Sequence, residues 1–383
     1  MLISLGLALG SGALLYLIRS DPFVASWAVV AAAIVLLPPA LGAGRPRLKR
    51  ALLITASLLL VFAALDAEVA ILFKPRVTVE GGVGYVVRDP LLGYRPRPGA
   101  RAAIKWGRFG QSIYDARYSI DQDGFRLTRA SGARDADTTV FLGDSYVFGD
   151  GLNDADTLPQ QFSAAKGYRQ RVINAAFSGY GTQQVLRLIE SDRLGSQLGT
   201  GRRLFVYPVI EEHVRRIEGR SPLDWMGSPR YVLDGGKARL AGRFHPGLDG
   251  VLLGMVTRSA IVAALHNQSM LEPSGGSPEL FGAMVQQARD EAARRYGARF
   301  VVLLWDEPIL RDRDQHDPAR AQRRAAMVET IAAELKRRGV EVLRISQLIP
   351  DYPAHMPAYI IGGSGHPSAL ANRRLAEALA ARF

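Results

Sequence analysis

The chain has 383 residues, no cysteine and a formal net charge of +12. Its length allows a large hydrophobic core, and the missing cysteine excludes disulfides and thiolate chemistry. The basic excess suits anionic neighbours such as lipid head groups or an acidic glycan. Nucleic acid is not expected as a partner, because no nucleic-acid-binding motif accompanies the charge.

The first 73 residues are dominated by apolar runs. These cover residues 2–18, 23–44 and 51–65, and the last continues to Phe73 through Asp66 and Glu68. Because roughly 20 apolar residues span a bilayer, we expect residues 1–73 to be a membrane region with three transmembrane helices. A signal sequence followed by two helices is the alternative.

The charged loops predict the orientation of this region. Four basic residues lie at positions 45–50, between the second and third runs, and positive loops stay inside. The third helix would then lead outward, and the rest of the chain would lie outside the cytoplasm. Asp66 and Glu68 either mark the outer interface or contact a partner protein in the membrane.

Downstream of the apolar runs, the pattern changes to alternating strands and helices. Residues 74–136 predict a linker and an N-terminal extension with short β-like stretches, and residues 216–276 predict an insertion. Alternation of this kind predicts a parallel sheet covered on both faces. The expected strands are 138–142, 171–175, 203–209, 299–304 and 340–345, and the expected helices are 157–166, 182–194, 278–296, 318–338 and 368–381.

The first of these strands ends in Gly143-Asp144-Ser145. A serine at the carboxyl end of a parallel strand is where α/β sheets carry their sites. Glycine permits a tight turn, and a helix starting at the serine would direct free N–H groups toward its hydroxyl. The alternative is a turn without chemistry, since these are common turn residues.

The surrounding residues 143–159 resemble the first block of the GDSL/SGNH hydrolase family, most closely its membrane-attached bacterial branch. Residues 172–183, 205–215 and 363–368 resemble the second, third and last blocks in the expected order, although the last two are degraded. The resemblance implies a three-layer α/β/α, flavodoxin-like parallel sheet over residues 137–383. It also implies a bacterial inner-membrane protein whose soluble domain lies in the periplasm.

The resemblance also implies site residues. Ser145 would be the nucleophile, His366 the base, and the N–H groups of Ser145 and Gly179 the donors to an oxyanion. The family's aspartate, two or three residues before the histidine, is replaced here by Ser364 or Gly363. A serine hydroxyl can fix the histidine tautomer but stabilises its positive charge less well.

The third block lacks the family's asparagine, so auxiliary groups have to be considered. Asp144, Glu212 and His213 are candidates, and His213 or Arg215 could donate to an oxyanion. A carboxylate for His366 could come from one of four residues near strand ends, which are Glu211, Glu212, Asp306 and Glu307. No metal and no cofactor are expected, because the metal and nucleotide motifs are missing.

These observations lead to two functional hypotheses. The first is a membrane-anchored, periplasm-facing esterase or O-acyltransferase acting on acyl esters of cell-surface glycan or lipid-linked sugar. The second is a catalytically silent module of the same fold that binds glycan or serves as a subunit of a membrane protein complex. In both, the lipid bilayer is a partner.

Overall fold

The structure is a computed structural model that describes residues 24–306 and 318–383, apart from residues 43, 75, 83, 109, 222 and 271–275. The expected apolar run at 2–18 and the candidate Glu307 lie outside the described residues.

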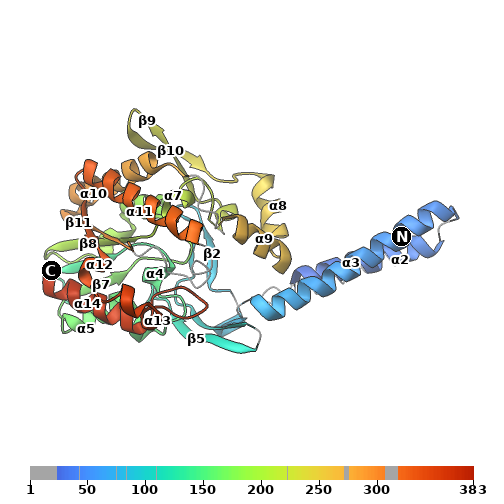
Figure 1. Ribbon diagram of the computed structural model, residues 1–383, viewed down its shortest axis with the longest axis horizontal. Helices are drawn as coiled ribbons and strands as arrows, with labels where there is room; N and C mark the ends of the chain where they lie inside the picture. The colour runs from blue at the N-terminus through green and yellow to red at the C-terminus, as the bar shows by residue number, and fades with distance from the viewer. Residues whose placement is uncertain are drawn as a thin grey trace.

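Two apolar helices, α2 (Val24–Gly42) and α3 (Pro46–Phe73), lie side by side and project from the rest of the molecule (Figure 1). Within the described part of the chain, α3 is the one helix whose length and apolar composition are sufficient to cross a membrane. The expectation of three spanning helices is corrected accordingly. Helix α2 ends soon after its Pro38-Pro39 pair, which removes backbone donors, whereas α3 continues through its acidic residues to Phe73.

The extension expected at 74–136 forms small antiparallel sheets. Strands β1 (Arg76–Val79), β4 (Arg101–Arg108) and β5 (Gln111–Ser119) form one, and β2 (Val86–Asp89) pairs with β3 (Gly93–Pro96). Side chains from these strands, among them Tyr94 and Tyr118, belong to the main hydrophobic core. The extension is therefore part of the folded body rather than a tether.

The main sheet is parallel and has five strands in the order β12-β11-β8-β6-β7. If these five strands are renumbered along the chain and read from β7 to β12, the order is 2-1-3-4-5, which is the flavodoxin-like order. The direction of winding reverses between β6 and β8. Ligand sites in such sheets lie at this switch point, beyond the carboxyl ends of the strands. The predicted parallel sheet is confirmed; its strands are β6 (Thr138–Phe141), β7 (Arg171–Asn174), β8 (Arg203–Val209), β11 (Ala298–Leu304) and β12 (Glu341–Arg344).

Helices cover both faces of this sheet (Figure 1). Helices α5 (Leu158–Ala165) and α14 (Ala369–Arg382) pack together on one face, and α6 (Thr182–Glu190), α10 (Pro278–Tyr296) and α11 (Pro318–Arg337) cover the other. Shorter helices occupy the connections, namely α4 (Ser145–Phe148), α7 (His213–Arg216), α12 (Ile345–Leu348) and α13 (Met356–Tyr359).

Local sequence explains where the best-predicted helix, α10, starts and stops. The Ser277 side chain accepts a hydrogen bond from the Leu280 N–H, and Pro278 occupies the first turn, where no backbone donor is needed. Gly297 ends the helix in the left-handed conformation at φ 59°.

The insertion expected at 216–276 carries a hairpin and two helices. The hairpin is β9 (Pro229–Asp234) and β10 (Lys237–Arg243), preceded by a short 3-10 turn, η4 (Asp224–Met226). The helices are α8 (Leu248–Val256) and α9 (Ala260–Met270), and α9 packs against α3.

Candidate active site

Ser145 lies directly beyond strand β6, where the sequence placed it. Gly143 makes the turn at φ 132°, and a Cβ there would come within 3.2 Å of Val147. Asp144 then caps helix α4 by accepting a hydrogen bond from the Tyr146 N–H at 3.0 Å. Ser145 is the first residue of that helix and is 7% exposed, so the turn presents its hydroxyl at the edge of the sheet.

His366 lies on the loop that precedes helix α14. Gly363 and Gly365 adopt φ 74° and 73°, and the Ile361 N–H donates to the His366 carbonyl at 2.8 Å. The Tyr146 hydroxyl donates to the Gly365 carbonyl at 3.0 Å, and its ring centroid lies 5.4 Å from that of His366. The residue next to Ser145 therefore holds the histidine loop in place.

These two segments bring Ser145 and His366 into contact, as the sequence analysis expected. His366 Nε2 lies 2.9 Å from Ser145 Oγ, and its Nδ1 lies 2.6 Å from Ser364 Oγ. If Nδ1–H donates to Ser364, the lone pair on Nε2 can accept the Ser145 proton; the two contacts together indicate this tautomer. The hydroxyl of Ser364 thus occupies the position where the family places a carboxylate.

A nearby carboxyl group, Asp150, was missed by the sequence analysis. Its N–H donates to the Ser145 carbonyl at 3.0 Å, and its Oδ1 accepts from Ser178 Oγ at 2.7 Å. Burial raises the pKa of Asp150, while the charge of His366 acts in the opposite direction. Asp150 therefore places a carboxyl group close enough to interact with the imidazole. Its signal was its place in the Ser145 block, five residues downstream, rather than before the histidine.

The two predicted oxyanion donors lie on loops that the backbone joins. The Phe177 N–H donates to the Gly143 carbonyl at 3.2 Å, which connects the second block to the first. Among the described residues, neither the Ser145 N–H nor the Gly179 N–H donates to a protein acceptor. Gly179 adopts φ 78°, and a Cβ there would come within 2.9 Å of the Tyr94 hydroxyl. Both donors thus remain available to a ligand, and any larger residue at 179 would be strained.

Asp144, one of the candidate auxiliary residues, lies in a buried ion pair. It is 1% exposed and pairs with Arg216 at 2.7 Å, while His213 Nε2 lies 3.4 Å from the same carboxylate oxygen. Burial alone would raise the pKa of Asp144, but the Arg216 guanidinium holds that pKa well below its usual range. Asp144 and Arg216 therefore form a buried ion pair behind the Ser145 turn.

His213 is also part of this support. It is fully buried, stacks on Tyr207 with centroids 5.5 Å apart, and its Nδ1 lies 3.4 Å from the Ile210 N–H. His213 and Arg215 are both buried beside the third-block turn, and the expectation that one of them donates to an oxyanion stays a prediction. Burial also lowers the pKa of Arg215.

Three of the four carboxylates proposed to assist His366 lie within the described residues, and all three have partners elsewhere. Glu211 pairs with Arg324 at 3.2 Å, and Glu212 pairs with Arg216 at 3.0 Å. Asp306 accepts from the Ser346 N–H at 3.0 Å. The third-block segment thus forms an ion-pair network in which Glu211 pairs with Arg324 and Glu212 pairs with Arg216 at the end of α7. The physical reason is charge, because two adjacent buried carboxylates are costly unless each is paired with a cation. Glu211 and Glu212 therefore pair with arginines rather than with His366.

Arg126 holds the backbone segment that follows Ser145. Its guanidinium donates to the carbonyls of Phe148, Gly149 and Leu152 at 2.7, 2.8 and 2.6 Å and pairs with Asp154 at 3.0 Å. The side chain is 1% exposed and lies over the Tyr118 ring at 4.3 Å. A buried cation that binds several carbonyls fixes the backbone that follows Ser145.

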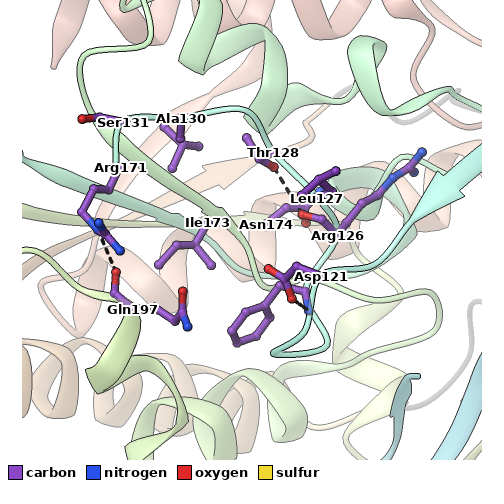
Figure 2. Close-up of a pocket in the computed structure, with 12 residues that line it drawn as sticks. Asp121, Arg126, Leu127, Thr128, Ala130, Ser131, Arg171, Ile173, Asn174 and Gln197 are labelled. Atoms are coloured by element: carbon purple, nitrogen blue, oxygen red, sulfur yellow. Dashed lines mark hydrogen bonds between the residues drawn. The ribbon is translucent and has the colours of Figure 1, made fainter. Parts of the chain in front are cut away.

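Arg126 also lines a separate cavity beside strand β7, shown in Figure 2. Asn174, Ile173 and Arg171 from β7 line it together with the 121–131 segment, whereas Ser145 and His366 do not. Within the part of the chain that the structure describes, no group of three His, Asp or Glu side chains could hold a metal.

Comparison with known proteins gives weak likenesses. No family model matches the chain, and no curated protein matches it. One similar structure is of a protein assigned to the G-D-S-L lipolytic family from Desulfitobacterium hafniense, 11% identical with a TM-score of 0.37, covering 64% of this chain and 99% of its own. Another is an extracellular lipase from Streptomyces rimosus, 15% identical with a TM-score of 0.37, covering 65% of this chain and 100% of its own.

A third similar structure is an acetylxylan esterase from Geobacillus stearothermophilus, with 11% identity and a TM-score of 0.34, covering 66% of this chain and 94% of its own. Because all three TM-scores are low, the case for a function has to come from the geometry of the site itself.

Proposed function

We propose that this protein is a membrane-anchored serine ester hydrolase or O-acyltransferase of the SGNH type. The observation that carries the proposal is the contact of Ser145 Oγ with His366 Nε2 at 2.9 Å, with Nδ1 held by Ser364 at 2.6 Å. A hydroxyl nucleophile, a base within reach and a group that orients the base are the parts that acyl transfer by serine requires. Free N–H donors at Ser145 and Gly179 complete the set.

The chemistry follows from these positions. The Ser145 proton passes to His366 Nε2 as the oxygen attacks the acyl carbonyl carbon, and the N–H groups of Ser145 and Gly179 stabilise the oxyanion. When the tetrahedral intermediate collapses, the ester C–O bond breaks and His366 returns the proton to the leaving alkoxide. Water or a sugar hydroxyl then attacks the acyl-enzyme, with His366 again as the base.

The groups beside His366 affect how well it acts as a base. In a serine protease, loss of the triad carboxylate's function costs about 10⁴ in turnover. Ser364 fixes the tautomer without a charge, whereas Asp150 places a carboxyl group near the imidazole. We therefore expect turnover to depend on both Ser364 and Asp150.

The anchor and the substrate class are inferred from different observations. Helix α3 is long and apolar enough to cross a membrane, and the basic residues at 45–50 precede its apolar part. By the positive-inside rule, the catalytic region then lies outside the cytoplasm, in the periplasm of a bacterial cell. Acyl esters of cell-surface glycan or lipid-linked sugar are the substrates expected at that place.

The proposal is tested by labelling with a fluorophosphonate and by turnover of an artificial acetyl ester. The full chain in detergent should label, and the Ser145→Ala variant should lose both labelling and turnover. Ser131→Ala, beside the cavity of Figure 2, is the matched control and should keep both. Equal labelling of the wild type and Ser145→Ala would reject Ser145 as the nucleophile.

The alternative, a silent module that binds glycan or a membrane protein, is favoured by one observation. The third block carries Glu212 in an ion pair with Arg216 in place of an oxyanion donor. If the wild-type chain neither labels nor turns over an ester while remaining folded, this second function replaces the first.

A further inference from the structure

A buried acidic residue joins the apolar helix α3 to the insertion. Asp66 is fully buried, and its Oδ1 accepts hydrogen bonds from Ser259 Oγ at 2.6 Å and from the Ile261 N–H at 2.9 Å. Two turns further along α3, Lys74 Nζ donates to the Arg258 carbonyl at 2.6 Å. An ionisable group in a membrane helix is costly unless it is paired, so the start of α9 serves as the partner that Asp66 needs.

The neighbouring helix α8 exposes apolar side chains on one face. Leu248, Val251 and Leu252 are 71%, 51% and 52% exposed, and their spacing of three and four residues places them on the same side of the helix. The other side is held against the body, because a Cβ on Gly254 would come within 2.5 Å of the Trp225 ring. Helix α8 is therefore oriented with its apolar side outward.

Helix α9 adds Leu265, which is 67% exposed. We call Leu248, Val251, Leu252 and Leu265 the α8–α9 apolar face. Exposed apolar groups gathered in this way mark a site of interaction rather than ordinary surface.

Helix α9 packs against α3, and the end of α3 also exposes apolar side chains. Leu65, Ile71 and Phe73 near the end of α3 are 51%, 59% and 38% exposed, and α9 packs against this part of the helix. Figure 1 shows α8 and α9 at the end of the soluble region nearest α3. The basic Lys74 and Arg258 lie at the same junction, at the level where lipid head groups would meet the end of a membrane helix.

We infer that α8 and α9 form a second membrane contact, with the α8–α9 apolar face embedded in the surface of the bilayer that α3 crosses. This inference rests on the proposed membrane anchor and extends it. The occupant is lipid, because α9 packs against α3, the helices expose apolar side chains, and basic residues lie at the junction of α3 and α9. Buried apolar area and cationic side chains are what hold interfacial helices to a membrane. The soluble region would then be attached to the membrane both through α3 and through the α8–α9 apolar face.

Because the chain has no cysteine, single thiols can report on this contact. The variants L252C and L265C probe the face, L58C probes the exposed middle of α3, and L127C probes an exposed leucine beside β7 (Figure 2). In Figure 1, β7 lies at the end of the soluble region away from α3. Each full-length variant is labelled with an environment-sensitive fluorophore in vesicles of phosphatidylcholine and phosphatidylglycerol. Quenching is then measured with nitroxide-labelled lipid and with iodide.

We expect lipid nitroxide to quench positions 252, 265 and 58 several-fold more strongly than position 127, and iodide to quench mainly position 127. Quenching of 252 and 265 by iodide, with 58 still quenched by lipid, overturns the inference while leaving the anchor intact. Protection of 252 and 265 from both quenchers indicates a protein partner and also overturns it. If position 58 escapes the lipid nitroxide, the anchor itself is rejected and the inference with it.

Discussion

The Tyr146 hydroxyl donates to the Gly365 carbonyl across 219 positions of sequence, and this bond connects the turn that carries Ser145 to the loop that carries His366. The same ring lies 5.4 Å from the imidazole and 5.4 Å from Trp305. Tyr146 is therefore a positioning residue, because its hydroxyl holds the backbone of the loop that carries His366.

Replacing Tyr146 with phenylalanine should test this role. The variant keeps the ring and removes one hydrogen bond, so we expect a loss of about 1 kcal/mol in the free energy of unfolding. If the bond aligns His366, kcat should fall several-fold while KM for an artificial ester stays unchanged. A fall in stability with an unchanged kcat would show that the bond only stabilises the fold.

Ser364 should determine how well His366 acts as a base. Ser364→Ala removes the acceptor 2.6 Å from Nδ1 and should lower kcat by at least about tenfold, since the imidazole loses its fixed tautomer. Ser364→Asp supplies a charged acceptor at the same place and should raise kcat above that of the wild type. Steady-state kinetics on both variants is the measurement, and a wild-type rate in Ser364→Ala would contradict the role.

Asp150 should make stability depend on pH in an unusual direction. Burial raises its pKa in the folded protein above the unfolded value of about 4. The folded state therefore binds the proton more tightly, and its stabilisation is complete below the unfolded pKa and lost as pH rises through the folded pKa. Urea unfolding at several pH values should show this loss in the wild type and not in Asp150→Asn. Parallel curves for the two proteins would reject the assignment.

The buried pair of Asp144 and Arg216 should be costly to break. Removing one partner leaves a buried charge, so Arg216→Met should lower the free energy of unfolding by about 3–5 kcal/mol. Asparagine can still cap helix α4, so the double variant with Asp144→Asn should recover part of that loss. Chemical denaturation of the two variants is the measurement, and equal stability would show that the charges are not coupled.

Asp66 should hold helix α9 to α3. Asp66→Ala removes the acceptor of the Ser259 hydroxyl and the Ile261 N–H, so hydrogen exchange over residues 259–263 should become faster. Glu68→Ala is the matched control, since Glu68 is exposed on the same helix, and it should leave that exchange unchanged. Identical exchange in the wild type and Asp66→Ala would show that other contacts fix α9.

The sequence predicted the elements of the main sheet because hydrophobic periodicity and the residues that begin and end helices and strands are local signals. Helix α10 matches its predicted bounds at 278–296, since Ser277, Pro278 and Gly297 mark both ends within a few residues. The position of Ser145 was equally readable, because an apolar run followed by Gly143 determines where the strand ends.

The partners of the site residues were harder to predict, because tertiary packing selects them. Glu212 pairs with Arg216, which is four residues further along the same segment, whereas Asp144 pairs with the same arginine from 72 residues away. Asp150 lies five residues after Ser145, but only the folded loop brings it near His366, which its place in the sequence does not indicate. Hydropathy placed α2 closely, but among the described residues α3 alone is long and apolar enough to cross a membrane, so the prediction of several spanning helices was too high there.

The place of Arg126 has a practical consequence for anyone shortening this protein. Its guanidinium holds the backbone at Phe148, Gly149 and Leu152, and the Tyr118 ring that covers it belongs to strand β5. A truncation at residue 137, the start of the α/β alternation, would remove both and leave three carbonyls without their cation. Soluble versions made for crystallisation or assay should therefore retain every strand from β1 onward.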